Sequence, residues 1–318
     1  MKYLYLLSAL CILFVHCSGQ KTQKVEEAES AEGNPLPAFR MPAIPSVLVE
    51  PGERAEYLVK HYWDNFDFSD TSYIHLPEIT EQAFVDYIDI MPYAAIPVVS
   101  GSIKDMLKRA EAEKKTLLYF TDLYEKYLYE PNSSLRDDEF FIPVLEAMLA
   151  SPLVEEKTRP AYLLKLALRN RKGETATDFT YTLADGNKAT LHSIRSDYTL
   201  LFFYNPDCRN CKEVSELLKA SLPIQYFMKE DKLRILALYP DEDLTAWRNY
   251  IPNVPTEWIN AYDADTRIKD DEIYDLKAIP IIYLLDKRKT VLLKDPTFEA
   301  LEYFLQQQIS PAEVISSK

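Results

Sequence analysis

Residues 199–211 read TLLFFYNPDCRNC, and this stretch decides how the C-terminal half of the chain is interpreted. The run from Thr199 to Tyr204 is apolar without alternation, which is typical of a strand buried on both faces of a sheet. Asn205 and Pro206 end the run, and from Cys208 onward the apolar residues recur at helical spacing. A pair of cysteines therefore lies where a buried strand passes into a helix.

This position has chemical consequences for the first cysteine of the pair. A helix N-terminus presents unpaired N–H groups and a partial positive charge, which favour a thiolate on Cys208. The thiolate can attack a disulfide sulfur to form a mixed disulfide, and Cys211, one helical turn later, can resolve it. Arg209 favours the thiolate and Asp207 opposes it, and the sequence alone does not rank the two. We therefore predict Cys208 as the nucleophile and Cys211 as the resolving thiol.

Strands alternate with helices around this stretch, which predicts an α/β domain over residues 171–318. An alternating segment at 178–182 and a turn at Asp185-Gly186-Asn187 open the domain. Buried strands are expected at 233–239, 279–285 and 291–293, and helices from Cys208, from Leu244 and over 298–309.

Residues 173–310 resemble the thioredoxin superfamily, and within it the exported TlpA-like thiol–disulfide oxidoreductases. The matching pieces are Gly173-x-x-Ala176-x-Asp178-Phe179, Asp185-Gly186 before Leu191-x-x-Ile194, the strand with its dithiol, and Ala278-Ile279-Pro280 before Tyr283-Leu284-Leu285-Asp286. The resemblance implies a mixed sheet flanked by helices, with Pro280 in the cis state in a loop beside the dithiol. It implies that this loop binds the substrate backbone and that Ile279 faces the substrate. The implied partners are a disulfide-containing protein and a membrane redox donor, and no cofactor is implied.

The chain departs from the family pattern at three places. Asn205-Pro206-Asp207 stands where a Trp usually precedes the first cysteine, and Phe202 stands where thioredoxins carry a buried acid. The acid that TlpA-like proteins place three residues after the second cysteine is replaced by Val214, with Glu213 one residue away. We expect Asp207, Arg209 and Glu213 to affect the acidity of Cys208 only weakly.

Residues 52–170 predict a separate all-helical domain. Apolar side chains recur at helical spacing over 55–66, Thr80 is expected to cap a second helix, and one long helix is expected over 102–129. Glycine is nearly absent here, and the prolines fall mainly between the periodic segments.

Two segments of this helical region carry a second resemblance. His61–Phe68 (HYWDNFDF) and Tyr129–Ser133 (YEPNS) resemble an uncharacterised helical domain that precedes thioredoxin-like domains in lipoproteins of Bacteroides-type bacteria. That resemblance covers residues 50–170 and implies no known activity.

Residues 1–19 predict an export signal. The apolar run over 3–15 is shorter than the roughly 20 residues that a membrane-spanning helix needs. Cys17 follows the run and resembles the lipidated cysteine of bacterial lipoproteins, whereas ordinary cleavage after Gly19 would discard it. Residues 20–51 are polar and then proline-rich, and we expect them to form a disordered tether. The predicted location is the periplasm or cell envelope, with an N-terminal lipid as the link to a membrane.

Composition excludes several other classes of protein. The chain carries 36 Lys and Arg against 50 Asp and Glu, a net charge of −14, which disfavours nucleic acid as a partner. None of its six glycines lies within ten residues of another, which excludes the common glycine-rich phosphate loops. The four histidines lack the spacing of a zinc-binding helix, and no metal site is predicted.

Three functions compete on this evidence. Cys11 lies inside the export signal and Cys17 at its end, so the folded part of the mature chain keeps two cysteines, Cys208 and Cys211, and the loop they would close is too small for the disulfide to stabilise the fold much. This favours an extracytoplasmic thiol–disulfide oxidoreductase. The alternative is a lipid-anchored binding module whose helical domain captures a protein or glycan, with a vestigial or regulatory dithiol. Metal binding by two thiolates is disfavoured, since no further ligands lie nearby, and the acidic run 263–271 lacks the glycine of a calcium loop.

Overall fold

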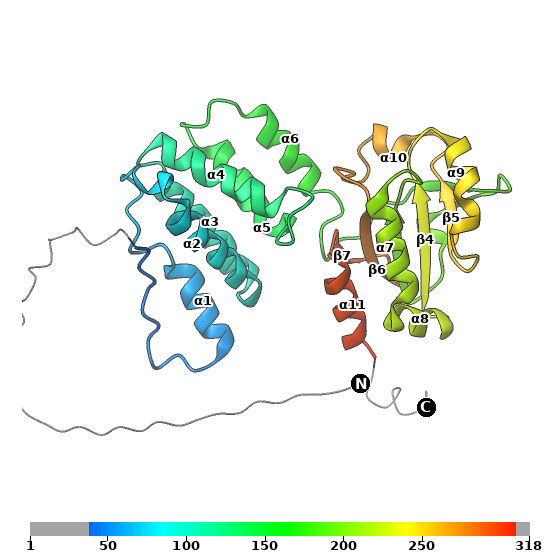
Figure 1. The fold of residues 1–318 in the computed structure, drawn as a ribbon, viewed down its shortest axis with the longest axis horizontal. Coiled ribbons are helices and arrows are strands. Elements are labelled where there is room, and N and C mark those ends of the chain that lie inside the picture. Colours follow the sequence, from blue (N-terminus) through cyan, green and yellow to red (C-terminus); the bar gives the residue numbers. More distant parts are fainter. Residues whose placement is uncertain (1–37, 310–318) are drawn as a thin grey trace, which may run out of the picture. The chain divides into compact units, whose positions relative to one another are not determined.

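The computed structural model describes residues 38–309, and the residues from Phe39 onward belong to one compact unit (Figure 1). The predicted export signal, the lipidation candidate Cys17 and the tether up to residue 37 lie outside the described residues.

Helices fill the first half of the described chain, which confirms the prediction of a helix-rich N-terminal region. We call residues 51–167 the helical part. Its α-helices are α1 (Pro51–His61), α2 (Pro77–Ile90), α3 (Ile96–Ala110), α4 (Lys114–Leu128), α5 (Asp138–Ala150) and α6 (Thr158–Ala167), with short 3-10 turns η1 (Tyr73–His75) and η2 (Met91–Tyr93). Their apolar faces share one core, in which the Trp63 ring packs edge-on against Phe120 with ring centroids 5.3 Å apart.

Three details of the predicted helices are wrong. The first helix ends at His61, although Phe66 still packs into the same core. The second begins at Pro77, where the missing N–H of proline costs nothing, so Thr80 lies inside the helix and donates its hydroxyl to the Tyr73 carbonyl. The expected long helix is two helices, because Glu113 leaves the helical conformation and caps α4 with its carboxylate.

The predicted tether is shorter on its C-terminal side than expected. The Phe39 ring stacks on Tyr62 with centroids 5.0 Å apart and meets Trp63 edge-on at 5.3 Å. Burying an aromatic ring stabilises this position, so the chain joins the helical core before residue 51.

The second half of the chain is a seven-stranded mixed sheet with flanking helices, which confirms the predicted fold class. We call residues 180–307 the sheet part. Its strands are β1 (Thr180–Leu183), β2 (Lys188–Thr190), β3 (Tyr198–Phe203), β4 (Leu233–Tyr239), β5 (Ile259–Tyr262), β6 (Ile281–Asp286) and β7 (Val291–Lys294), in the order β2-β1-β5-β4-β3-β6-β7. Its helices are η3 (Leu191–Ser193), α7 (Arg209–Ala220), α8 (Leu222–Lys229), α9 (Leu244–Tyr250), η4 (Ile251–Asn253), α10 (Arg267–Asp270) and α11 (Phe298–Gln307).

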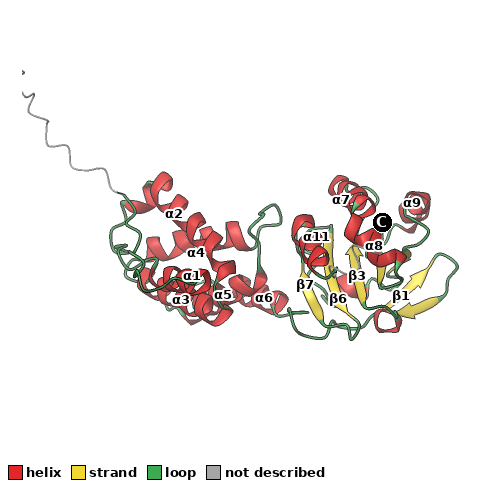
Figure 2. Ribbon diagram, turned by 90° about the horizontal axis from the view of Figure 1, so that it is seen from below, coloured by secondary structure: helices red, strands yellow, loops and turns green. Residues whose placement is uncertain are grey.

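Side chains of the central strands alternate between two cores. Leu200 and Phe202 of β3 point to the face covered by α7, α8, α9 and α11, which lie on the same side of the sheet (Figure 2). Leu201 and Phe203 point to the opposite face and pack with residues of β1, η3 and α10. Both faces are covered, which explains why the strand is apolar at every position from Leu200 to Phe203.

The strand pairing brings the predicted site together. β3 is parallel to β4 and antiparallel to β6, with Phe203 opposite Ile281. The residues that follow β3 therefore lie beside the residues that precede β6. These are the segments that carry the dithiol and Pro280.

Candidate active site

The dithiol is presented by a tight turn between β3 and α7. The Asn205 side-chain oxygen accepts the Asp207 N–H at 2.9 Å, and the Asn205 carbonyl accepts the Cys208 N–H at 3.1 Å. The Asn205 amide in turn donates to Asp241 Oδ2 at 2.8 Å. Asn205 thus orders the turn, in the segment Asn205-Pro206-Asp207 that replaces the tryptophan usually found before the first cysteine.

The two sulfurs differ in exposure and in their contacts. Cys208 caps α7 and is half-buried, whereas Cys211 is 2% exposed, and the two form a disulfide in this structure. The Cys211 N–H donates to Cys208 Sγ at 3.1 Å, so a backbone dipole of the first helical turn points at the sulfur predicted to be the nucleophile. When the disulfide is reduced, this geometry stabilises a thiolate on Cys208.

The loop before β6 lies against the same sulfur. The Ile279–Pro280 peptide bond is cis, and the Ile279 carbonyl oxygen is 3.4 Å from Cys208 Sγ. Four of the predicted site residues (Cys208, Cys211, Ile279 and Pro280) are therefore brought together from segments that lie about seventy residues apart in the sequence.

The predicted modulating side chains lie on the surface, Asp207 just before α7 and Arg209 and Glu213 on its first turn and the one that follows. Asp207 and Arg209 are exposed, and Arg209 donates to Glu213 Oε1 at 2.9 Å across one helical turn. Arg209 and Glu213 thus form a solvent-exposed ion pair whose charges are screened by water.

The core beneath the dithiol is neutral. Phe202, at the family's acid position, stacks on Tyr204 with centroids 5.7 Å apart. The Tyr204 hydroxyl and the Trp247 indole N–H both donate to Asn260 Oδ1, at 2.9 and 3.2 Å. Burial raises the pKa of Tyr204, so this hydroxyl stays protonated.

Sequence analysis missed Asp241 and Asn260 as supports of the site. Asp241 follows β4 by two residues, just as Asn205 follows β3, and the carboxyl ends of parallel neighbours meet at one sheet edge. That topology is a signal from which the Asn205–Asp241 bond was predictable. Asn260 lies on β5, a strand that the sequence analysis did not predict.

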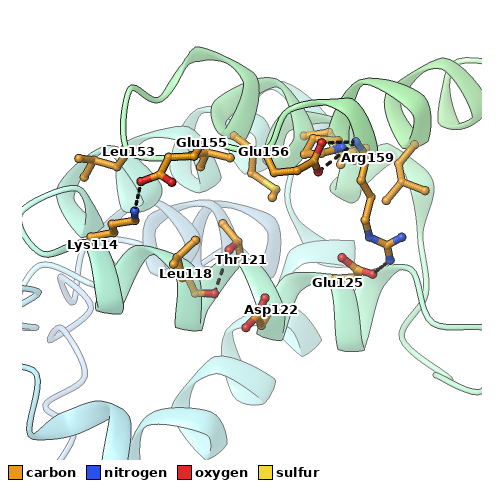
Figure 3. Close-up of a pocket in the computed structure, with 14 residues that line it drawn as sticks. Lys114, Leu118, Thr121, Asp122, Glu125, Leu153, Glu155, Glu156 and Arg159 are labelled. Carbon is orange, nitrogen blue, oxygen red and sulfur yellow. Dashed lines mark hydrogen bonds and ion pairs between the residues drawn. The ribbon is translucent and has the colours of Figure 1, made fainter.

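The helical part carries a separate groove of about 340 Å³ between α4 and the segment that leads into α6 (Figure 3). Leu118 and Leu153 lie on its apolar lining, and ion pairs Lys114–Glu155 and Glu125–Arg159 bridge its two sides. Burial raises the pKa of Asp122, whose carboxylate lines the same groove.

The described residues hold neither a metal cluster nor a membrane-spanning helix. Across residues 38–309, no three His, Cys, Asp or Glu side chains are arranged to hold a metal ion. None of the helices in that range combines the length and the apolar character needed to cross a bilayer.

Comparison with known proteins finds relatives of both halves. Residues 16–170 match a family described as a domain of unknown function (DUF5106), and residues 196–291 match a family described as thioredoxin-like. A crystal structure of a thioredoxin-like protein from Bacteroides caccae is 51% identical, with a TM-score of 0.81, and the match covers 86% of this chain and 99% of that one.

Two further structures match parts of the chain. The C-terminal domain of an uncharacterized protein from Bacteroides fragilis is 49% identical over 43% of this chain and 98% of its own, with a TM-score of 0.43. A domain of a possible thiol-disulfide isomerase from Cytophaga hutchinsonii is 24% identical over 48% of this chain and 99% of its own, with a TM-score of 0.39. No curated protein matches the chain.

Proposed function

The chain belongs to the thioredoxin-like proteins, with a thioredoxin-like domain preceded by a domain of unknown function, and on that basis we propose that it is a thiol–disulfide oxidoreductase acting on protein substrates. The observation that carries the proposal is the contact of 3.4 Å between Cys208 Sγ and the Ile279 carbonyl oxygen. It sets the more exposed sulfur beside a loop able to hold an extended substrate backbone.

The proposed reaction transfers two electrons from the reduced dithiol to a substrate disulfide. The Cys208 thiolate attacks one substrate sulfur, which forms a mixed disulfide and releases the other substrate sulfur as a thiolate. Cys211 then attacks Cys208, its proton passes to the departing substrate sulfur, and the Cys208–Cys211 disulfide forms. A dithiol reductant, or the reverse reaction with a substrate dithiol, returns the protein to its reduced form.

The accessibilities support this assignment of roles. An incoming disulfide reaches half-buried Cys208 before it reaches Cys211, which is 2% exposed. Cys211 needs only to reach the neighbouring sulfur of Cys208, and the Cα atoms of the two cysteines are 5.2 Å apart. Ile279 and Pro280 are the residues we propose for substrate binding. The proposed reaction uses no cofactor.

We further propose that the protein acts outside the cytoplasm, in the periplasm or cell envelope, held to a membrane by a lipid on Cys17. The support is the short apolar run that ends next to Cys17 and the polar, proline-rich segment that follows. Detergent-phase partitioning and mass spectrometry of the processed N-terminus test this. Recovery of an unlipidated chain that begins at residue 20 would refute the anchor, and Cys17→Ser is the matched variant.

Trapping of a mixed disulfide tests the oxidoreductase proposal. Reduced Cys211→Ser is expected to capture insulin chains as a stable mixed disulfide, because the resolving sulfur is missing. Cys208→Ser is the control, since its remaining thiol is buried. Capture by Cys211→Ser no greater than capture by Cys208→Ser would reject the proposal.

The alternative is a binding module whose helical domain captures a protein or glycan, with a regulatory or vestigial dithiol. The groove beside Asp122 favours it, because an apolar lining with a partly desolvated carboxylate suits a ligand that combines apolar and cationic groups. Asp122→Asn separates the two functions. The binding module would be favoured by two results together: Cys211→Ser traps no mixed disulfide, and Asp122→Asn loses binding of a partner that the unaltered protein binds.

A further inference from the structure

Six charged side chains form a buried cluster where the helical part meets the loop that precedes β6. Three are cations and three are carboxylates, so the cluster is neutral. We call it the ion cluster, and its members are Arg136, Asp138, Asp275, Lys277, Lys294 and Asp295. The side chains of four members are less than a tenth exposed, and those of Arg136 and Asp295 are 18% and 14% exposed.

Asp138 is the centre of the ion cluster. It is the first residue of α5, so the helix N-terminus adds to the positive potential around its carboxylate. One oxygen lies 2.9 Å from the Lys294 ammonium, and the other lies 3.4 Å from the Lys277 ammonium. Burial opposes the charged form, but these two ammonium groups outweigh it and hold the pKa of Asp138 below its ordinary value.

Lys277 connects this carboxylate to the dithiol. Its ammonium lies over the Tyr129 ring at 4.7 Å, so two residues of the helical part, Asp138 and Tyr129, enclose it. Its backbone N–H donates to Asp275 Oδ1 at 3.1 Å. Two residues later, the Ile279 carbonyl contacts Cys208 Sγ. Lys277 is therefore held at both its backbone and its side chain, directly before the loop that meets the nucleophile.

The other two cations have further partners, and neither precedes the Ile279–Pro280 loop in the chain as Lys277 does. Lys294 donates to the carbonyls of Ala167 and Arg169 as well as contacting Asp138. Arg136 makes a two-pronged contact with Asp295, at 2.9 and 3.3 Å. A buried ammonium without a close carboxylate is costly, and of the three carboxylates around Lys277 that of Asp138 is the nearest, at 3.4 Å, with Asp275 and Asp295 each at 3.9 Å.

We propose that Asp138 of the helical part is a positioning residue for the active site, which fixes the Ile279–Pro280 loop against Cys208 through the ammonium of Lys277. The helical part then completes the substrate-binding surface instead of serving only as a separate module. This inference rests on the proposed function for its catalytic consequence, but the loop positioning can be measured without any activity.

Hydrogen exchange of the oxidised protein tests the positioning directly. Asp138→Asn is expected to speed exchange of the Lys277 amide, which donates to Asp275, by about tenfold or more, while amides of β3 stay protected. The matched control is Lys165→Met, which removes an exposed ion pair with Glu272 that also joins the helical and sheet parts but lies outside the ion cluster. Unchanged exchange of the Lys277 amide in Asp138→Asn would overturn the inference, whatever happens to overall stability.

Kinetics test the catalytic consequence. Asp138→Asn is expected to raise the KM for insulin by about tenfold with a smaller change in kcat, because the loop binds the substrate backbone. The rate at which reduced Cys208 reacts with the small disulfide 5,5′-dithiobis(2-nitrobenzoate) should change less than about twofold, since this reagent needs no loop. Equal losses with both reagents would show a general structural effect and overturn the inference.

Conservative variants keep the test decisive if Asp138→Asn folds poorly. Lys277→Arg retains the cation and is expected to keep the KM for insulin near that of the unaltered protein, whereas Lys277→Gln is expected to reproduce Asp138→Asn. The double variant Asp138→Asn with Lys277→Gln should be no worse than either single variant, because both act through one contact. Additive losses would overturn the inference. Failure of the unaltered protein to reduce insulin would reject the proposed function and leave the exchange result to decide the positioning.

Discussion

Reduction of the Cys208–Cys211 disulfide should destabilise the protein only slightly. The disulfide joins residues with a sequence separation of 3, so it removes little entropy from the unfolded chain. For a closed loop of four residues, the loop-entropy relation gives about 2 kcal/mol, and native strain or residual structure lowers that value. For a chain of 318 residues, with an unfolding entropy of about 2.1 cal/mol/K per residue, about 2 kcal/mol corresponds to a fall in melting temperature of about 3 °C. The Cys211 N–H already contacts the Cys208 sulfur in the oxidised form, and this hydrogen bond strengthens when reduction leaves a thiolate on Cys208, which offsets part of the loss.

Urea unfolding with and without dithiothreitol measures this difference. Trp247 and Trp258 are buried in the core beneath the dithiol and Trp63 is buried in the helical core, so fluorescence follows both halves of the chain. The double variant Cys208→Ser/Cys211→Ser is the control, and its midpoint should not respond to the reductant. A loss above about 4 kcal/mol, or unfolding on reduction, would show that the disulfide has a structural role of the size known for long-loop disulfides and refute our reasoning.

Three further predictions concern single residues. Reduced Cys208 should be alkylated with a midpoint below about pH 8.5, the value of a free cysteine, and a midpoint at or above it would contradict the helix N-terminal argument. Burial, with a contribution from Arg195, lowers the pKa of Lys289, which is 3% exposed. Between the lowered pKa of the folded state and the ordinary pKa of about 10.4, Lys289 is therefore protonated in the unfolded chain and neutral in the folded one. The free energy of unfolding relative to Lys289→Met should rise with pH over this range, as urea titrations at several pH values would show. Asn205→Ala should slow insulin reduction by about tenfold because the turn and its bond to Asp241 are lost, whereas exposed Asn249→Ala should change it little.

Local sequence patterns were enough to predict the elements whose residue types directly reflect their burial. The strand 233–239 has the predicted bounds, since its apolar run is bounded by polar residues and both faces are buried. The strand before the dithiol was expected over 199–204 and runs from Tyr198 to Phe203, one residue earlier. The prediction of the cis Ile279–Pro280 bond is confirmed, and it came from the family resemblance.

Other features were outside the reach of local patterns. The break between α3 and α4 falls within Glu111–Glu113, where the sequence has only good helix formers and neither Gly nor Pro, so nothing local announces it. The ion cluster joins residues such as Asp138 and Lys277 that are 139 positions apart, and each appears in the sequence as an ordinary surface charge. Such contacts are set by how the helical and sheet parts meet, which periodicity does not encode.

The neutral core beneath the dithiol has a consequence for how protons move. Thioredoxin-like proteins commonly place an acid near the resolving cysteine, but here that position holds Phe202, and the neighbouring hydroxyl of Tyr204 is a donor to Asn260. Among the described residues, no carboxylate is hydrogen-bonded to either sulfur. The proton of Cys211 must therefore leave with water or with the departing substrate thiolate as the mixed disulfide is resolved. A substrate thiol of low pKa is a good leaving group but a poor proton acceptor, so this arrangement favours substrates whose thiols titrate near ambient pH. Selectivity among disulfides would then come from the leaving thiol and from the loop at Ile279, and not from an internal acid.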